Sequence, residues 1–304
     1  MIYLRNKSAA EFTSENSSIA LGKFDGIHIG HQDLIKRLIK DKEKGYRAIV
    51  FSFAISPRFI LHGGEKKTIY TSQEKALYLS ELGVDVLMEY PFTKKFANSK
   101  PEDFVKDCLV DKLNVKQIYV GEDFCFGKNR QGNVPLLKEL GEKYGFHVCA
   151  IPQRKFRGKI VSSSLIRDLI GTNFSVANRM LGNPYFIYNE VIHGKHLGNT
   201  IGFPTINQEI SSQKIVPQNG VYASRVLIDG KSYQAISNLG VKPTIKGENQ
   251  LGLETHILDY SGDLYNKFIK TELLYFIRNE RKFDNLNALK RQIEKDVAVS
   301  RKNT

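Results

Sequence analysis

The first half of the chain alternates short apolar runs with segments whose apolar residues recur at helical spacing. Leu34, Ile35, Leu38 and Ile39 show the helical pattern, and Gly45 stands where such a helix would stop. The predicted strands are 19–21, 48–53, 84–88, 117–120 and 147–151, and the predicted helices are 32–44, 72–82, 135–144, 165–170 and one that begins near 99–103. Apolar strands that alternate with helices are typical of a mostly parallel sheet with both faces covered. We therefore predict an α/β domain, whose strand order the pattern leaves open.

The second half has a different pattern, because short strand-like runs follow one another with no long helix between them. These runs are 185–191, 221–228, 233–236, 253–258 and 273–277. Asp229 and Gly230, between two of the runs, favour a tight hairpin. Only after Asp284, the expected N-cap, do apolar residues at helical spacing indicate an amphipathic helix. The pattern predicts a small closed β-barrel with a terminal helix, joined to the first domain near 172–184.

Composition narrows the class of protein. The chain has 304 residues and a formal net charge of +13. No apolar run approaches the roughly 18 residues of a membrane span, and no basic start with an apolar core indicates a secretory signal, so we expect no membrane association. The three cysteines, Cys108, Cys125 and Cys149, form no C-x-x-C pair, which favours a reducing cytoplasm over a disulfide framework or a zinc knuckle. The positive charge fits nucleic acid, nucleotides and phosphates equally well.

The most informative segment is the loop 22–31, GKFDGIHIGH, which follows a predicted strand and leads into a helix. Glycines let a backbone approach phosphate closely, and a helix N-terminus offers free N–H groups and positive potential. His28 and His31 are three residues apart, so at a helix start both imidazoles can face one anion. Such donors could stabilise charge on a phosphorus centre during adenylyl transfer. The alternatives are a surface loop with two incidental histidines, or a metal pair that lacks a third ligand.

This H-x-G-H loop resembles that of the nucleotidylyltransferase superfamily, and the longer string resembles the bacterial bifunctional riboflavin kinase/FAD synthetase family. Seven further blocks agree with that family in order along the chain: 121–127, 161–167, 202–207, 219–223, 254–257, 263–265 and 278–283. The resemblance implies a Rossmann-like nucleotidylyltransferase domain over 1–183, the FMN adenylyltransferase. It also implies a riboflavin kinase-like β-barrel with a terminal helix over 184–304.

The same resemblance implies two reactions of flavin cofactor synthesis. The barrel would transfer a phosphoryl group from ATP to riboflavin to give FMN, and the first domain would transfer AMP from ATP to FMN to give FAD and pyrophosphate. The expected partners are small molecules (ATP, riboflavin and FMN) with Mg²⁺, and neither nucleic acid nor a membrane. One alternative is a riboflavin kinase only, with a weakened adenylyltransferase domain. Another is a basic nucleic-acid-binding protein, although the sequence has no zinc knuckle and no long basic run with interleaved aromatics.

For the adenylyltransferase, the resemblance implies that His28 and His31 are catalytic. It implies that ATP is bound by Gly22, Phe24, Asp25, Gly30, Asp123, Ser162, Ser163, Ser164 and Arg167. From the residues alone, the three serines open a predicted helix and are either an ordinary N-cap or, with Arg167, a grip for a triphosphate. Asp123 is either a turn-capping residue or a ligand of a ribose hydroxyl or a phosphate group.

For the kinase, the sequence contains no P-loop, so the phosphates must be held in another way. Gly194, Gly198 and Gly202 recur every four residues before Pro204 in a polar segment. This pattern favours a flexible glycine flap over phosphates rather than a helix-packing stripe. The resemblance implies that Gly198, Gly202 and Pro204 bind the ATP of the kinase.

Thr205 and Asn207 are two residues apart in an extended segment, so their side chains would point the same way and offer two neutral oxygens. The resemblance implies that they hold Mg²⁺, which takes few protein ligands beside phosphate. Glu254 and His256 also share one strand face, and Glu254 matches the family's catalytic glutamate. From the residues alone, a half-exposed surface glutamate is the alternative. We interpret 278–282 as a solvated charged turn with no catalytic role.

The chain departs from the family pattern near both sites. At 54–57 it has Ala-Ile-Ser-Pro where the family usually has an acid, a proline, a histidine or asparagine, and a proline. A polar residue expected near the adenylyltransferase site is therefore missing. Asn199 replaces the usual arginine after Gly198, which removes one cation from the ATP side of the kinase site, and Ser164 for threonine keeps the hydroxyl. We expect these changes to affect rates rather than the type of reaction.

Overall fold

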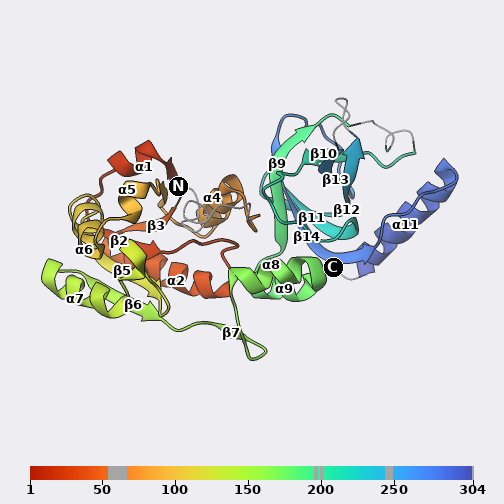
Figure 1. The fold of residues 1–304 in the computed structure, drawn as a ribbon. Helices are drawn as coiled ribbons and strands as arrows, with labels where there is room; N and C mark the ends of the chain where they lie inside the picture. The colour runs from red at the N-terminus through yellow and green to blue at the C-terminus, as the bar shows by residue number, and fades with distance from the viewer. Residues whose placement is uncertain (54–66, 195–197, 199–200, 244–248, 303–304) are drawn as a thin grey trace. The chain divides into compact units, whose positions relative to one another are not determined.

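The computed structural model describes residues 1–53, 67–194, 198, 201–243 and 249–302, and these form two compact units (Figure 1). The first unit contains the described residues of Met1–Lys66 and Lys75–Ser163. The second contains Lys67–Glu74 and the described residues of Ser164–Thr304. A short segment from the first half of the sequence thus belongs to the second unit.

The first unit is built on a six-stranded parallel sheet. Its strands are β1 (Ile2–Arg5), β2 (Ser17–Leu21), β3 (Arg47–Phe53), β4 (Val86–Tyr90), β5 (Val115–Gly121) and β6 (His147–Ile151), in the order β1-β4-β3-β2-β5-β6. Every neighbouring pair is parallel. From β2 the chain builds the sheet first on one side and then on the other, so its direction switches between β2 and β5. Ligands of open α/β sheets bind at such a point, outside the carboxyl ends of the strands.

Helices and turns connect these strands. They are α1 (Lys7–Glu11), α2 (Ile29–Lys40), η1 (Asp41–Lys44), α4 (Ser72–Glu81), which begins in the second unit, α5 (Lys94–Ala97), α6 (Pro101–Asp103), η2 (Phe104–Val110), η3 (Lys128–Arg130) and α7 (Val134–Tyr144). A small hairpin follows β6 and consists of β7 (Lys155–Phe156) and β8 (Lys159–Ile160).

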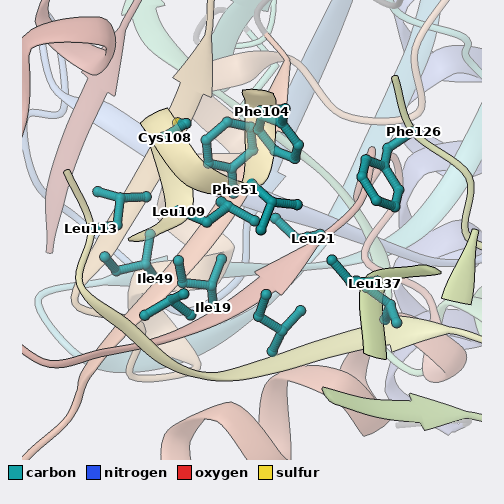
Figure 2. Close-up of a cluster of buried hydrophobic side chains, with 14 of the residues drawn as sticks. Ile19, Leu21, Ile49, Phe51, Phe104, Cys108, Leu109, Leu113, Phe126 and Leu137 are labelled. Carbon is teal, nitrogen blue, oxygen red and sulfur yellow. The ribbon is translucent and has the colours of Figure 1, made fainter. Parts of the chain in front are cut away.

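Side-chain alternation along the central strands buries both faces of the sheet. Ile19 and Leu21 of β2 and Phe51 of β3 belong to one apolar cluster, together with Phe104 and Leu137 (Figure 2). On the other face, α2 packs against β2, β3 and β5. It buries Leu34, Ile35 and Leu38. The predicted parallel sheet, covered on both faces, is confirmed.

Two helix boundaries lie where residue types in the sequence predicted them. Gly45 closes the predicted helix 32–44 with a φ of 79°, the left-handed conformation that glycine favours. At the predicted start near 99–103, the carboxylate of Asp103 accepts a hydrogen bond from the backbone N–H of Lys100 at 3.2 Å. Strand β1 and the β7–β8 hairpin were not predicted, because runs of four and two residues carry little periodicity.

The second unit is a closed antiparallel β-barrel with helices before and after it. Its elements are α8 (Ser163–Thr172), which starts at the unit boundary, α9 (Phe174–Leu181), β9 (Tyr185–Ile192), β10 (Ile206–Glu209), β11 (Gly220–Ile228), β12 (Lys231–Pro243), β13 (Asn249–Ile257), β14 (Phe268–Arg278) and α11 (Leu286–Lys302). The barrel closes in the order β10-β13-β12-β11-β14-β9. Asp229 and Gly230 have φ values of 48° and 77°, as the predicted tight hairpin requires. The predicted barrel and terminal helix are confirmed.

Two details of the second half differ from the prediction. The stretch 172–184, expected only as a join, contains α9. The N-cap of α11 is Asn285 rather than Asp284, because the Oδ1 of Asn285 accepts a hydrogen bond from the backbone N–H of Ala288 at 2.9 Å. An N-cap side chain reaches the N–H of the second or third helical residue, and α11 begins at Leu286, so only position 285 has that reach.

Side chains alternate between the interior and the outer face of the barrel. Leu239 and Leu253 are fully buried, and the hydroxyls of Ser237 and Thr255 share a hydrogen bond of 2.7 Å in the interior. Glu254 stands between two of these interior residues, so it points to the outer face.

A buried ion pair joins the segment Lys67–Glu74 to the rest of the second unit. The Nζ of Lys214 lies 2.5 Å from the Oε2 of Glu74, and the two side chains are 1% and 2% exposed. The same Nζ donates to the backbone oxygen of Ile69 at 2.9 Å and lies 4.4 Å from the ring centroid of Tyr185. A charge buried without its partner is strongly destabilising, so the position of Lys214 depends on Glu74.

We expect Glu74→Ala to lower the free energy of unfolding of the second unit by about 3–5 kcal/mol, because the buried ammonium of Lys214 loses its carboxylate. Urea unfolding followed by circular dichroism measures the loss. Glu11→Ala is the control, since this carboxylate is 65% exposed and lies 3.7 Å from Lys7. Exposed pairs of this kind contribute at most about 1 kcal/mol. Equal losses in the two variants would contradict the prediction.

Candidate active sites

The loop 22–28 lies at the carboxyl end of β2, beside the switch point of the sheet, and its backbone is strained. Phe24, Gly26 and Ile27 have φ values of 49°, 81° and 42°. A positive φ is unfavourable for residues other than glycine, and most of all for a β-branched residue such as Ile27. Phe24 and Ile27 are fully buried, so packing holds the strained backbone in place. Strain of this kind is concentrated at binding and catalytic sites.

The loop delivers two histidines to the start of α2. His28 is the N-cap residue, and its Nδ1 accepts a hydrogen bond from the backbone N–H of His31 at 3.4 Å. The two rings stack with centroids 3.7 Å apart and an interplanar angle of 16°. A Cβ on Gly30 would lie 3.3 Å from the ring of His28, so the glycine leaves room for the imidazole. The structure therefore brings both predicted imidazoles to one helix N-terminus.

Both imidazoles are neutral at pH 7. Burial lowers the pKa of His28 from its ordinary value of 6.5 to about 4, although the charge of Asp25 acts in the opposite direction. Burial also holds the pKa of His31 well below its ordinary value, and the neighbouring His28 and Lys75 add to this effect. Because the Nδ1 of His28 accepts a hydrogen bond, we assign its proton to Nε2, which is then available as a donor.

The rest of the loop is fixed by close contacts. A Cβ on Gly22 would lie 3.1 Å from the ring of Phe24, and the centroid of that ring lies 5.0 Å from that of His31. The hydroxyl of Ser163, the first residue of α8, donates to the backbone oxygen of Asp25 at 2.9 Å. The predicted residues of the loop and the second serine of the helix start thus lie together with the histidines.

Asp123 lies in the loop after β5, on the other side of the switch point. A Cβ on Gly121 would lie only 2.9 Å from the Oδ1 of Asp123, so the glycine lets this carboxylate fold back over the strand end. The boundary between the two units falls within the serine run 162–164, so Ser164 and Arg167 belong to the second unit. That the serine run and Arg167 bind ATP stays a prediction.

The second unit contains a cavity of about 350 Å³ on the outer face of the barrel. The glycine flap before β10, the outer faces of the barrel strands and the terminal helix α11 contribute its walls. The predicted residues Gly198, Thr205, Asn207 and Glu254 line it together with His256. A volume of this order suits a small-molecule ligand.

Strand pairing puts the predicted metal ligands beside the predicted base. Asn207 of β10 lies directly opposite Glu254 of β13, and residues in such a pair have their side chains on one face. Thr205, two residues before Asn207, points the same way. A Cβ on Gly194 would overlap the amide of Asn207, so this glycine makes room for the asparagine. Two neutral oxygen donors and a carboxylate thus share one wall of the cavity.

Glycines also shape the flap. The backbone N–H of Phe203 donates to the backbone oxygen of Gly198 at 2.9 Å, and a Cβ on Gly198 would overlap the carbonyl of Phe203. Gly202 has a φ of 83°, which a residue with a Cβ rarely adopts. The Nδ1 of His256 lies 2.8 Å from the backbone oxygen of Pro204 and ties the end of the flap to β13.

The sequence pattern did not predict the opposite wall of the cavity. Arg278 was interpreted as part of a solvated turn, but its Nη2 lies 2.7 Å from the buried carboxylate of Asp296 in α11, so this interpretation is wrong for Arg278. Glu280 lines the cavity beside it. One signal was available, since Asp296 follows Ile293 by three residues on the apolar face of the terminal helix. A charged residue on such a face needs a partner.

The structure bears on some of the alternatives and departures that the sequence raised. Within the described ranges, no group of three or more His, Cys, Asp or Glu side chains could hold a metal ion, so His28 and His31 find no third ligand there. Over the same residues, no helix combines the length and the apolar character that crossing a membrane requires. The departures at 54–57 and at Asn199 lie outside the described residues.

Comparisons with known proteins match each half of the chain to a family and the whole chain to bifunctional relatives. The FAD synthetase family model matches residues 11–165, and the riboflavin kinase family model matches residues 181–304. The chain is 36% identical to the bifunctional riboflavin kinase/FMN adenylyltransferase of Haemophilus influenzae, over 99% of this chain and 98% of that protein. It is also 36% identical to the protein of that name from Escherichia coli K12, over 94% and 92% of the two chains. The chain belongs to the bifunctional riboflavin kinase/FMN adenylyltransferase family.

Each candidate site therefore lies within the family match for which it was predicted. The FAD synthetase match contains the loop 22–31, and the riboflavin kinase match contains the cavity beside β13. A solved structure titled as a macrolide-efflux protein from Streptococcus pneumoniae has a TM-score of 0.83 and 28% identity over 100% of both chains. That structure shares the fold of both domains, and its title describes that protein alone.

The neutral histidines predict an acid-sensitive FAD synthetase domain. In the unfolded chain both imidazoles titrate near 6.5, whereas in the folded protein His28 stays neutral down to about pH 4. Between these values the unfolded state binds more protons, so stability is complete above 6.5 and falls as the pH falls, by up to about 1.4 kcal/mol per pH unit for each histidine.

Urea unfolding of the unaltered protein and of His28→Gln, at about pH 7.5 and about pH 5, measures this contribution. The glutamine does not titrate, so His28→Gln should lose less stability on acidification than the unaltered protein. Titrating groups away from this site are the same in both proteins and cancel in the difference, whereas the loss of His28 also removes its effect on the pKa of His31, which acts in the same direction. An identical loss in both would show that His28 is not held neutral by the fold.

Proposed function

We propose that this chain makes FAD from riboflavin in two ATP-dependent steps, one in each domain, with domain limits at 1–183 and 184–304. The observation that carries the proposal is that Thr205, Asn207 and Glu254 line one cavity of the barrel. Phosphoryl transfer to an alcohol needs charge neutralisation at the phosphates and a carboxylate at the hydroxyl, and this wall offers the groups for both.

In the riboflavin kinase domain, the 5′-hydroxyl of riboflavin attacks the γ-phosphorus of ATP. A bond forms between the 5′ oxygen and this phosphorus, the bond from the phosphorus to the bridging oxygen of ADP breaks, and the hydroxyl proton passes to Glu254. Thr205 and Asn207 would hold Mg²⁺, whose charge neutralises the phosphates. Their neutral oxygens suit this hard cation, which keeps few protein ligands. In this proposal Gly198, Gly202 and Pro204 belong to the flap through which the backbone approaches the ATP phosphates.

In the FAD synthetase domain, a phosphate oxygen of FMN attacks the α-phosphorus of ATP, and pyrophosphate leaves. The N–H groups at the start of α2 and the Nε2–H of His28 donate to the oxygens on which charge develops. Because the pKa values of His28 and His31 are lowered, the two imidazoles act as hydrogen-bond donors and bring no buried charge of their own. Asp123, the serines 162–164 and Arg167 bind the ribose and phosphates of ATP in this proposal.

The proposed setting is the cytoplasm, with small molecules as the partners. Cys108, Cys125 and Cys149 are free thiols, as is usual for proteins of a reducing compartment. The net charge of +13 suits the anionic substrates ATP and FMN. Neither nucleic acid nor a membrane is part of the proposal.

The first test is to incubate the protein with riboflavin, ATP and Mg²⁺ and to separate riboflavin, FMN and FAD by chromatography. We expect both FMN and FAD from the unaltered protein. His31→Ala should form FMN at the normal rate and lose about 10²–10³-fold in FAD formation, the usual cost of removing one charge-stabilising donor. FMN alone from the unaltered protein would favour the alternative of a kinase with a weakened adenylyltransferase. An equal loss of both products in folded His31→Ala would refute the division between the domains.

The second test separates the base from the metal ligands of the kinase. Glu254→Gln keeps the shape of the side chain but cannot accept the hydroxyl proton, so kcat for FMN formation should fall by about 10²–10⁴-fold with nearly unchanged KM values. Asn207→Ala should instead weaken the apparent affinity for Mg-ATP, with partial recovery at high Mg²⁺. FAD formation from supplied FMN should survive both changes. A rise only in the KM for riboflavin in Glu254→Gln would make Glu254 a binding residue.

A further inference from the structure

A row of side chains runs across the barrel along one wall of the cavity. Asn207 lies opposite Glu254, Glu254 opposite Asn238, Asn238 opposite Val221, and Val221 opposite Arg278. Residues directly opposite each other share a face, and neighbouring strands lie about 4.7–4.9 Å apart. All five residues line the cavity, so each strand contributes one side chain of the row to its wall.

Asn238 is next to Glu254 in this row, and its side chain forms a hydrogen bond with Glu280. The Nδ2 of Asn238 donates to the Oε1 of Glu280 at 3.0 Å. Gly240 follows Asn238 by two residues on β12 and shares its face. A Cβ on Gly240 would overlap the carboxylate of Glu280, so the glycine leaves the space that the carboxylate fills. The backbone of β12 therefore provides a notch for Glu280 beside the amide.

This pair presents hydrogen-bond acceptors to the cavity. The Oδ1 of Asn238 is buried and has no hydrogen-bond partner among the residues that the structure describes. The nearby guanidinium of Arg278 is engaged elsewhere, since it donates to Asp296 at 2.7 Å and to the backbone oxygen of Asn279 at 3.0 Å. A carboxylate can only accept, and a buried amide oxygen without a donor is unfavourable. Donors on a ligand would satisfy both groups.

The substrate of the proposed kinase carries donors at the matching place. Riboflavin has its reacting 5′-hydroxyl at one end of a ribityl chain, three secondary hydroxyls along this chain, and the isoalloxazine ring at the other end. An extended ribityl chain is slightly longer than one strand spacing. With the 5′-hydroxyl at Glu254 and the chain directed along the row toward β12, the secondary hydroxyls would lie beside Asn238 and Glu280. The lining of the same cavity includes the apolar side chains of Phe283 and Ile293, which suit the isoalloxazine ring.

We propose that Asn238 and Glu280 recognise the secondary hydroxyls of the ribityl chain and so select flavins with a polyol side chain over flavins with a plain alkyl alcohol. This inference rests on the proposed kinase function of the barrel. A site that hydrogen-bonds a substrate hydroxyl rejects an analogue without it strongly, because the polar groups of the site are left unpaired.

The test compares two substrates in the full chain. One is riboflavin, and the other is its analogue with a 5-hydroxypentyl side chain, which keeps the ring and the primary alcohol but lacks the secondary hydroxyls. For the unaltered protein we expect kcat/KM to fall by about 10²-fold or more with the analogue. Glu280→Ala should lower kcat/KM for riboflavin by about 10–10²-fold, mostly through KM, and change the value for the analogue by less than about threefold.

Lys282→Ala is the matched control, because Lys282 is exposed in the same turn and does not line the cavity, and it should leave both substrates unchanged. Glu280→Gln keeps the shape and one acceptor, so it should discriminate between the substrates better than Glu280→Ala. An equal fall for both substrates in Glu280→Ala would overturn the proposal, as would an unaltered protein that accepts both substrates equally. An unaltered protein that phosphorylates neither substrate would instead refute the kinase assignment, so the two conclusions fail separately.

Discussion

The pairing of Glu254 with Asn207 on one neighbouring strand and with Asn238 on the other is the constraint on which the proposed kinase site depends. Side chains alternate along a strand, so a slip of β13 by one residue would turn Glu254 into the barrel and bring Leu253 and Thr255 to its outer face, while Asn207 and Asn238 would stay where they are. The register that buries the barrel interior is therefore also the register that assembles the proposed kinase site.

The FAD synthetase domain depends on strand direction in a comparable way. Its six strands are parallel, so the carboxyl ends of β2 and β5 meet at one edge, and the loops that carry His28 and Asp123 follow them there. The buried side chains of Phe24 and Ile27 hold the first of these loops in a strained conformation. The core thus supplies the energy that keeps the two imidazoles stacked at the helix N-terminus.

Two basic side chains have a structural role in the second unit. Lys214 forms an ion pair with the buried carboxylate of Glu74, and Arg278 forms one with the buried carboxylate of Asp296. Each pair joins two segments of the second unit that are distant in the sequence. Such pairs add little net stability, but removing one partner is costly, so they specify which segments pack together. The imidazoles of the first site, by contrast, are neutral because burial opposes their protonation.

The sequence by itself determined the features that depend on neighbours along the chain. Periodicity predicted both domain classes, turn chemistry predicted the hairpin at Asp229, and the glycine-histidine loop predicted the first site. Only the tertiary structure decided which distant residues meet, such as Glu74 with Lys214, which are 140 residues apart, or Asn238 with Glu280. The physical reason is that the partner of a buried charge or amide is selected by strand register and by exclusion of water. Both are properties of the complete fold, and no local pattern along the chain records them.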